Sequence, residues 1–177
     1  HSSNRRQRQM CIRDRVRIAK KVNPNVEILA TRKTLPGLRD IEKRAVVHGG
    51  GATHRMRLDD AILIKDNHLK LSKNIKKSIE ISRSKYPNLM VEVEADNEQQ
   101  AIEIAKNGAD RVMLDNFSPD EATATIRKLR EISDIEIEIS GGVTIENIAS
   151  YAKKADFISL GSLTMSSLPV DFSLHVL

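Results

Sequence analysis

The chain has 177 residues, of which 40% are apolar and 30% charged, a composition typical of one globular domain with a hydrophobic core. No segment approaches the roughly 20 consecutive apolar residues that a membrane-spanning helix needs, and the first residues lack the apolar segment of a secretory signal. The single cysteine, Cys11, excludes an internal disulfide or a multi-cysteine metal site, so we expect a cytoplasmic protein with no membrane partner.

The net charge of +5 arises from the N-terminus. Residues 1–17 contain six arginines and one aspartate, whereas residues 18–177 contain 23 basic and 23 acidic side chains. Aromatic residues make up only 3% of the chain, which is too few for surfaces that stack on bases. We therefore do not expect nucleic acid as a partner.

The predicted elements begin after residues 1–15, which show no apolar periodicity and are expected to be disordered. Residues 16–177 contain no Pro/Gly-rich linker and are expected to form one domain. Apolar runs of β type predict strands at residues 26–32, 61–66, 89–95, 111–116, 135–142 and 157–162. Helical patterns lie at residues 35–49, 71–85, 97–109, 118–132 and 144–155, with Ser118 and Pro119 forming the clearest helix start.

Strands and helices alternate along the chain, which indicates parallel βαβ units. The strands end in polar residues, and this favours a TIM-like barrel over an open sheet. No Gly-x-Gly-x-x-Gly follows the first strand, as a dinucleotide-binding fold would require. Because a complete barrel has eight strands, the expected fold is an incomplete, six- to seven-stranded parallel α/β barrel.

Two sets of charged residues follow the predicted strands. Arg32, Lys33 and Lys65, together with the nearby His54 and Arg55, form a cationic set. Such a set suits a strongly anionic ligand, such as a polycarboxylate or a phosphate. A smaller acidic set, made of Glu94 and Asp115, suits Mg²⁺ or sugar hydroxyls.

Glycine-containing turns follow the last two predicted strands. These are Ser140-Gly141-Gly142 and Gly161-Ser162. Barrels often bind phosphate in the loops after their last two strands, where backbone N–H groups at a helix N-terminus contact the anion. The two turns are therefore candidates for a phosphate cradle.

Each of these features also has an interpretation without function. Lys65 could pair with the adjacent Asp66 as a structural ion pair, and residues 48–51 (HGGG) could be a flexible loop. Glu92 and Glu94 alternate with valines and could form one solvated face of a strand. Three methionines are expected to fill the core: Met56, Met90 and Met113.

Several motifs together resemble one enzyme family. The stretch ILATRKTLPGLRDIEKRAVVHGGGATHRMRLDDAILIKDNH (28–68) closely resembles the central part of the quinolinate phosphoribosyltransferases, which are also called nicotinate-nucleotide pyrophosphorylases (carboxylating). The motifs VEVEAD, VMLDN, EISGGVTIENI and DFISLGSLT follow in the family's order. The resemblance runs from about residue 19 to the C-terminus. It implies formation of nicotinate mononucleotide, pyrophosphate and CO₂ from quinolinate and 5-phosphoribosyl 1-diphosphate, with Mg²⁺, in NAD biosynthesis.

The resemblance also implies roles for individual residues. Arg32, His54 and Arg55 match residues that bind the carboxylates of quinolinate. Lys33 and Lys65 match lysines that face both substrates.

The remaining matches concern the phosphoribosyl donor. Glu94 and Asp115 match carboxylates that bind the ribose hydroxyls and Mg²⁺. The residues expected to cradle the 5-phosphate are Ser140, Gly141, Gly142 and Gly161. The expected catalytic residues are Lys33, Lys65, Glu94 and Asp115.

The chain also departs from the family pattern. The family's N-terminal domain, which adds cationic residues to the site of the partner subunit, is absent from this sequence, and residues 1–15 resemble nothing in the family. We expect residues 1–15 to be non-native and the full-length protein to be a homodimer or hexamer. Leu35 stands where the family usually has threonine.

Three other functions are weighed against this one. A paralogous barrel associated with molybdate transport would share the fold, but the intact "LIKDNH" and "TRKT" favour the quinolinate enzyme. A lyase would use Lys65 as a Schiff-base amine. A non-catalytic binding module would act through the basic N-terminal segment.

Overall fold

Seven parallel strands form one curled sheet in the computed structural model, which describes the backbone of residues 2–165 and the side chains of residues 11–165. The order across the sheet is β2-β1-β7-β6-β5-β4-β3, so β2 and β3 form its two edges. The strands are β1 Glu27–Ala30, β2 Ala52–Thr53, β3 Ile62–Ile64, β4 Val91–Ala95, β5 Arg111–Asp115, β6 Glu136–Ser140 and β7 Phe157–Leu160. The expected incomplete barrel is confirmed, with the two-residue β2 added to the six predicted strands.

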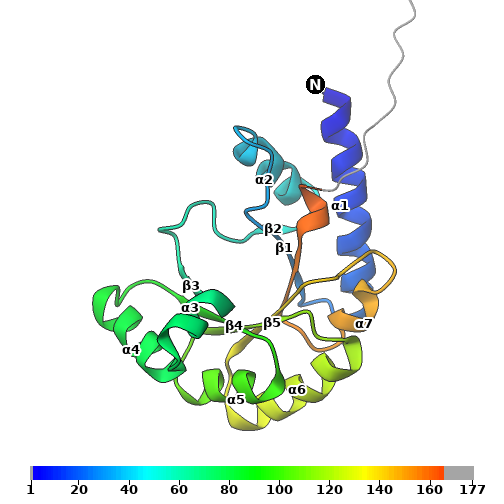
Figure 1. Ribbon diagram of the computed structural model, residues 1–177. Helices are drawn as coiled ribbons and strands as arrows, with labels where there is room; N and C mark the ends of the chain where they lie inside the picture. Colours follow the sequence, from blue (N-terminus) through cyan, green and yellow to red (C-terminus); the bar gives the residue numbers. More distant parts are fainter. Residues whose placement is uncertain (1, 166–177) are drawn as a thin grey trace, which may run out of the picture.

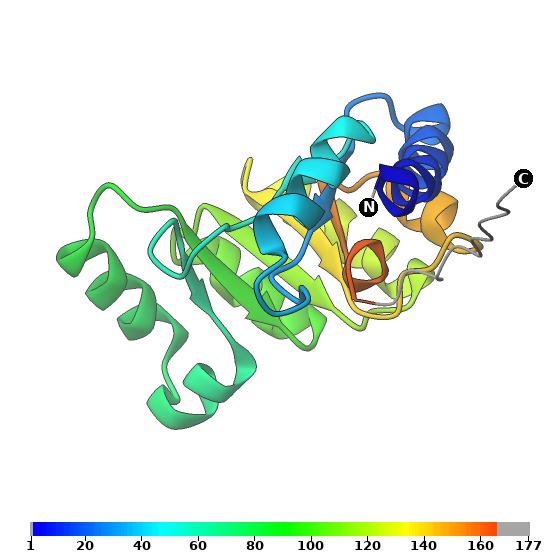
Figure 2. The same cartoon turned by 90° about the horizontal axis from the view of Figure 1, so that it is seen from above.

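Most of the helices lie on the outer side of the curled sheet (Figure 1). They are α1 Ser2–Val22, α2 Arg39–His48, α3 Asp66–Ser72, α4 Ile75–Lys85, α5 Glu98–Lys106, α6 Pro119–Ile132 and α7 Ile148–Ala152, and a 3-10 helix, η1, spans Gly161–Leu163. In Figure 2, α3 and η1, which follow β3 and β7, lie on the same side of the molecule. The carboxyl ends of the parallel strands therefore meet there. No helix in the described part of the chain is long and apolar enough to cross a membrane.

The first helix corrects the expectation of disorder over residues 1–15, because α1 begins at Ser2. Ile12, Val16 and Ala19 recur at the spacing of one helix face and are all buried in the core. Helix α1 packs against α2 and α7 through this face. Ile12, which precedes the expected domain 16–177, thus belongs to the hydrophobic core. Residues 166–177 of that domain lie outside the described part of the chain.

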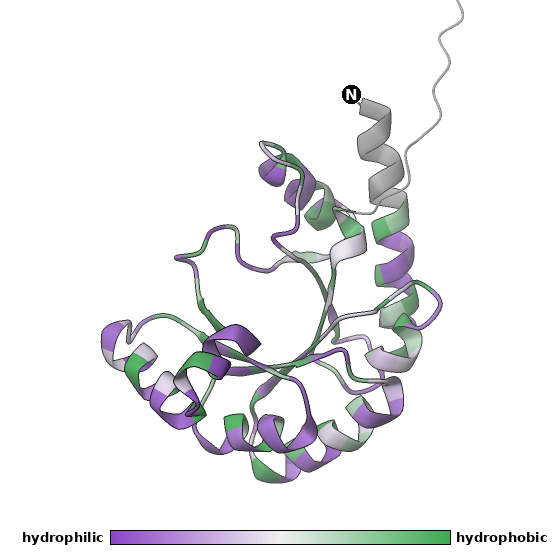
Figure 3. Cartoon of the chain, viewed as in Figure 1, coloured by the Kyte–Doolittle hydropathy of each residue, from purple (hydrophilic) through white to green (hydrophobic). Residues whose placement is uncertain are grey.

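Side chains alternate along each strand between the helices and the barrel interior. In β4, Val91, Val93 and Ala95 belong to the hydrophobic core, whereas Glu92 and Glu94 are buried polar residues between them. Figure 3 shows hydrophobic residues along the sheet and hydrophilic residues on the outer surfaces of several helices. Packing against the helices thus decides which residues of each strand point outward to the hydrophobic core. The residues between them point into the barrel interior, and several of these are polar.

Local capping explains two helix starts. Helix α6 begins with the expected Ser118 and Pro119, and Glu121 completes a capping box with Ser118. Helix α3 was not predicted: β3 ends at Ile64, and the backbone N–H of Lys65 donates to Nδ1 of His68 at 3.0 Å. The polar sequence after this strand therefore begins a short helix, with Lys65 as its N-cap.

The glycines in residues 48–51 are closely packed, so the flexible-loop interpretation of this segment is wrong. A Cβ atom on Gly49 would lie 2.5 Å from Cγ2 of Ile12. A Cβ atom on Gly51 would lie 2.8 Å from the carbonyl oxygen of Ile28. These glycines let the end of α2 approach α1 and β1.

Candidate active site

Two adjoining cavities lie at the carboxyl ends of the strands. The first has a volume of about 320 Å³ and is lined by Thr31, Arg32, Lys33, His54, Arg55, Leu63, Lys65, Glu94, Met113, Asp115, Glu138, Ser140 and Ser159. The second has a volume of about 330 Å³, and its lining includes Asn116, Gly141, Gly142, Gly161 and Ser162. Five residues line both cavities: Thr31, Lys33, Asp115, Ser140 and Ser159. Every residue predicted for the site lines one cavity or both.

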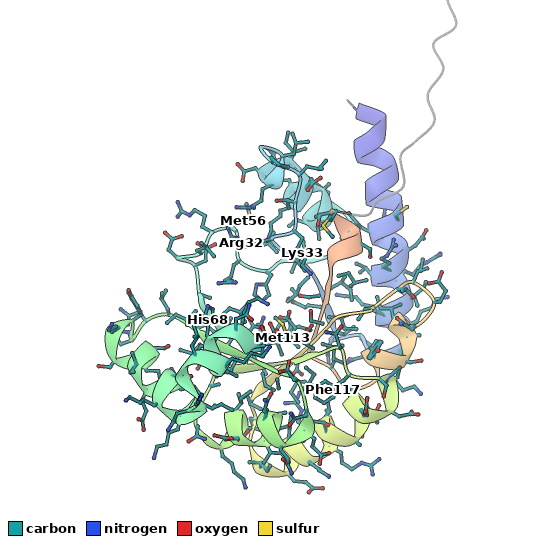
Figure 4. All side chains as sticks on the ribbon, viewed as in Figure 1. Arg32, Lys33, Met56, His68, Met113 and Phe117 are labelled. Atoms are coloured by element: carbon teal, nitrogen blue, oxygen red, sulfur yellow. The ribbon has the colours of Figure 1, made fainter. Side chains whose placement is uncertain are left out.

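The cationic side of the first cavity is formed by residues that follow β1 and β2. Figure 4 places Arg32 and Lys33 above Met113 of β5, which lines the cavity as well as filling the core. The Nε atoms of Arg32 and Arg55 are buried without a hydrogen-bond partner in the described part of the chain. Burial lowers the pKa of Arg55. Because a buried donor without a partner is unfavourable, these arginines are well suited to receive an anion.

Lys65 pairs across the sheet rather than with its neighbour in sequence. Its Nζ lies 2.6 Å from Oε2 of Glu94, whereas Asp66 pairs with Lys70 at 2.7 Å. The predicted alternative of a Lys65–Asp66 ion pair is therefore wrong. The solvated-face interpretation of Glu92 and Glu94 is also wrong, because their side chains are only 0% and 5% exposed.

Asp115 has a neutral partner. Its Oδ2 accepts a hydrogen bond from Nδ2 of Asn116 at 2.7 Å. An amide orients a carboxylate without cancelling its charge, in contrast to the ammonium group that faces Glu94. Asp115 therefore provides a negative charge at the junction of the two cavities.

A buried charge cluster forms part of the wall of the first cavity. Nε2 of His54 lies 2.8 Å from Oε2 of Glu92 and 3.3 Å from Oε2 of Glu138, and both carboxylate side chains are fully buried. Arg111 pairs with Glu138 at 3.2 Å, and the hydroxyl of Ser159 donates to the same carboxylate. These contacts join residues of β4, β5, β6 and β7 and the residue that follows β2, and they hold the interior of the barrel together.

The protonation of this cluster follows from its burial and its charges. Burial lowers the pKa of His54, but the hydrogen bonds and charges of Glu138 and Glu92 outweigh burial and raise it to about 9. Burial, together with the charge of Glu138, raises the pKa of Glu92 to about 7. Burial also acts to raise the pKa of Glu138, but hydrogen bonds from His54 and Ser159 and the charge of Arg111 hold it below its ordinary value.

Both ring nitrogens of His54 have partners within the protein. Nε2 faces the two carboxylates, and the backbone N–H of Arg55 donates to Nδ1 at 2.8 Å when the ring is neutral. The raised pKa of His54 favours the charged ring, in which Nδ1 also carries a proton, so the hydrogen bond from Arg55 belongs to the neutral form alone. In either form Nε2 faces the two carboxylates, and binding a ligand carboxylate through Nε2 would require the exchange of one of them.

The cluster predicts how stability depends on pH. The raised pKa values of Glu92 and His54 mean that the folded chain binds protons more tightly than the unfolded chain. Their contribution to stability is complete below the unfolded pKa and is lost as the pH rises through the folded value. We expect the free energy of unfolding to fall as the pH rises from about 5 to 8. Above about pH 8, the lowered pKa of Lys43 has the opposite effect, because there the unfolded chain binds the proton of this lysine more tightly.

Urea unfolding at several pH values tests this dependence. The Glu92→Gln variant keeps the size of the side chain but cannot titrate, so its free energy of unfolding should fall less steeply than that of the wild type between about pH 5 and 7. Parallel curves for the two proteins would contradict the role assigned to Glu92.

Several supporting residues were missed or left without a role by the sequence analysis. Glu138 lies two residues before Ser140, Ser159 lies two residues before Gly161, and Arg111 lies four residues before Asp115. Each is therefore on the same face of its strand as a predicted site residue, so strand alternation could have indicated all three. Lys43 offered no such signal, because its sequence neighbourhood is highly charged. It is nevertheless fully buried, and its Nζ donates to the carbonyl oxygens of Ala30 and Arg55.

Two groups could hold a metal ion. Glu94 and Asp115 supply carboxylate oxygens, which Mg²⁺ prefers, to the lining of the first cavity. The other group is His54, Glu92 and Glu138, whose ligand atoms lie within 4.8 Å of one another. Those atoms already pair with one another and with Arg111, and Glu94 pairs with Lys65, so Asp115, whose hydrogen-bond partner is a neutral amide, is the carboxylate of the two groups that fits Mg²⁺ best.

Comparison with known proteins agrees with this geometry. The profile described as "Quinolinate phosphoribosyl transferase, C-terminal domain" matches residues 11–175 and so begins inside the segment expected to be foreign to the family. A probable nicotinate-nucleotide pyrophosphorylase [carboxylating] of Archaeoglobus fulgidus is 43% identical over 163 residues, which cover 90% of this chain and 62% of that protein. The corresponding human protein is 39% identical over 153 residues, covering 84% of this chain and 51% of its own length.

Solved structures show the same similarity. The crystal structure of NadC from Streptococcus pyogenes superposes with a TM-score of 0.85 at 36% identity, covering 94% of this chain and 57% of that one. A NadC deletion mutant gives a TM-score of 0.87 at 35% identity, covering 96% of this chain and 59% of that one. The chain thus spans little more than half the length of these relatives. On the sequence match and the shared fold, the chain belongs to the quinolinate phosphoribosyltransferase family, to whose C-terminal domain it corresponds.

Proposed function

We propose that this chain carries the site for phosphoribosyl transfer from 5-phosphoribosyl 1-diphosphate to quinolinate, with decarboxylation to nicotinate mononucleotide. The observation that carries the proposal is a pair of cavities with shared lining residues, whose walls combine arginines and lysines with the carboxylates of Glu94 and Asp115. Quinolinate is a dianion and the phosphoribosyl donor a polyanion, so several fixed cations are needed to bring them together. The names of the relatives support the same reaction.

The two cavities suit the two substrates. Arg32 and Arg55 have buried donor atoms without partners and would bind the carboxylates of quinolinate. The second cavity, lined by Gly141, Gly142 and Gly161, would bind the 5-phosphate through backbone N–H groups. Lys33 lines both cavities and would therefore lie near the bond that breaks.

In the transfer step, the pyridine nitrogen of quinolinate bonds to C1 of the ribose as pyrophosphate leaves. Positive charge develops on the ribose ring, and the fixed negative charge of Asp115 would stabilise it. Lys33 and Lys65 would offset the charge of the departing pyrophosphate. Mg²⁺, which Glu94 and Asp115 fit, would supply further positive charge to the phosphate oxygens when bound.

Decarboxylation follows from the product of transfer. Once the pyridine nitrogen carries the ribose, the ring is cationic and accepts the electron pair of the breaking C–C bond as CO₂ leaves. The electron pair remains on C2 of the ring, which takes up one proton from water to complete the product, and the protein orients the carboxylate that leaves. This chemistry requires no general base and no Schiff base.

The surroundings of Lys65 disfavour the lyase alternative. A lysine that forms a Schiff base must react as a neutral amine. Lys65 instead forms a 2.6 Å ion pair with Glu94, an arrangement suited to a permanent cation.

The proposal also includes a cytoplasmic location and, for the full-length protein, a homodimer or hexamer.

Calorimetric titration of 5-phosphoribosyl 1-diphosphate with Mg²⁺ tests the proposal, together with chromatographic detection of nicotinate mononucleotide after quinolinate is added. We expect saturable binding and product formation by the wild type. Lys33→Ala should weaken binding about 10- to 100-fold, because it removes a charge-assisted contact. A folded wild-type chain that neither binds the donor nor forms the product would refute the proposed function.

A further inference from the structure

Asn116, directly after β5, has a backbone conformation that residues with a Cβ atom rarely adopt. Its φ is 58°, and Lys73 is the other non-glycine residue with a positive φ in the described part of the chain. Asparagine tolerates this region better than most residues, but the conformation persists only where its surroundings fix it. The proposed reaction as described above gives Asn116 no role of its own.

Contacts on both sides of Asn116 fix this conformation. Its backbone N–H donates to the carbonyl oxygen of Ser140 at 2.9 Å. The next residue, Phe117, is buried, and its carbonyl oxygen accepts a hydrogen bond from the hydroxyl of Tyr151 at 2.8 Å. Figure 4 shows Phe117 beside the ribbon that leads from β5 to α6, whose first turn Ser118 caps.

The side chain of Asn116 contacts both halves of the candidate donor site. Its Nδ2 donates to Oδ2 of Asp115 at 2.7 Å. Its Oδ1 occupies the space beside Gly141, where an added Cβ atom would lie only 2.2 Å away. One neutral side chain therefore lies between the carboxylate at the cavity junction and the glycine turn, and it leaves the charge of the carboxylate intact.

We propose that Asn116 is a positioning residue that sets the spacing between Asp115 and the Ser140–Gly142 turn, so that one sugar phosphate contacts both at once. The inference rests on the proposed function, in which Asp115 takes ribose hydroxyls and the turn takes the 5-phosphate. A ligand that bridges the two groups depends on their spacing. A ligand that contacts only the turn does not.

Titration of wild type and Asn116→Gly with ribose 5-phosphate and with inorganic phosphate tests this coupling. Glycine accepts the positive φ, so the substitution removes the side chain without straining the backbone. We expect the affinity for ribose 5-phosphate to fall about tenfold or more, since a hydrogen bond to a charged group is lost. The affinity for inorganic phosphate should stay within about twofold, because that ion needs only the backbone of the turn.

A second variant and a control separate positioning from folding. Asn116→Asp keeps the shape and the tolerance of positive φ but replaces the amide donor by a negative charge beside the turn, so it should weaken the binding of both ligands, in contrast to the selective loss in Asn116→Gly. Lys73→Gly relieves positive φ at the exposed end of α3, where Lys73 lines neither cavity, and should change neither affinity.

Equal losses of affinity for both ligands in Asn116→Gly, or no loss of affinity in that variant, would overturn the inference. A wild-type chain that does not bind ribose 5-phosphate would overturn it as well. The proposed function has a separate outcome. If the wild type binds ribose 5-phosphate with the expected selectivity but forms no nicotinate mononucleotide from quinolinate, the proposed function fails and the role of Asn116 stands.

Discussion

Replacing Glu138 with alanine is expected to lower the free energy of unfolding by about 3 kcal/mol. The side chain is fully buried and contacts Nε2 of His54 at 3.3 Å and Nη1 of Arg111 at 3.2 Å. The substitution leaves the His54 ring and the Arg111 guanidinium buried without this carboxylate. Removing one partner of a buried ion pair is strongly destabilising, because the other charge then lies in the interior without compensation. Glu92 remains to pair with His54, which keeps the loss near the lower end of the usual range.

Glu136→Ala provides a matched control, because Glu136 also pairs with Arg111. That ion pair measures 2.7 Å, but the Glu136 side chain is 46% exposed. Water can replace an exposed carboxylate, so the control should lose less than about 1 kcal/mol. Urea unfolding followed by circular dichroism measures both values. Similar losses for the two variants would show that the buried cluster is not the stabilising feature inferred here.

Replacing Asp115 with asparagine is expected to lower the rate of nicotinate mononucleotide formation by about 100-fold or more, as for the loss of one preorganised electrostatic group. Asp115 lines both cavities, and its hydrogen-bond partner is a neutral amide, so its negative charge is available to the ribose as positive charge develops there. Glu94 cannot replace it fully, because Lys65 lies 2.6 Å away and offsets its charge.

Asp96→Asn is the control for this substitution. Asp96 follows β4 in the same way that Asn116 follows β5, but it is exposed and does not line either cavity of the candidate site. The control variant should retain the wild-type rate, and thermal unfolding should be unchanged within error for both aspartate variants. An Asp115→Asn enzyme with wild-type kcat and KM would remove Asp115 from the catalytic group.

The candidate site was largely predictable because it lies at strand ends. Parallel strands bring their carboxyl ends to one side of a barrel, so residues as distant in sequence as Arg32 and Asp115 could be placed together without knowing the order of the strands. The glycine turns were predictable for the same reason, and residues Gly141, Gly142 and Gly161 line one cavity. The local alternation of apolar residues was sufficient to locate these ends.

Residues 1–15 were misjudged because their apolar spacing is sparse and their charge is high. Ile12 is buried against Gly49, a contact that joins α1 to the end of α2. The apolar residues of this segment, Met10, Cys11 and Ile12, are consecutive, so they show no helical periodicity. Burial against another part of the chain stabilises helix beyond what local propensity indicates.

The sequence by itself determined the parallel α/β class, the phase of the strands and which residues lie at the mouth of the barrel. Only the tertiary structure decided which of those residues contact one another. Lys65 pairs with Glu94 rather than Asp66, and His54 lies between Glu92 and Glu138. Periodicity is a local property that assigns a side chain to a face, whereas strand order and register, set by packing across the whole sheet, decide the partner it meets there.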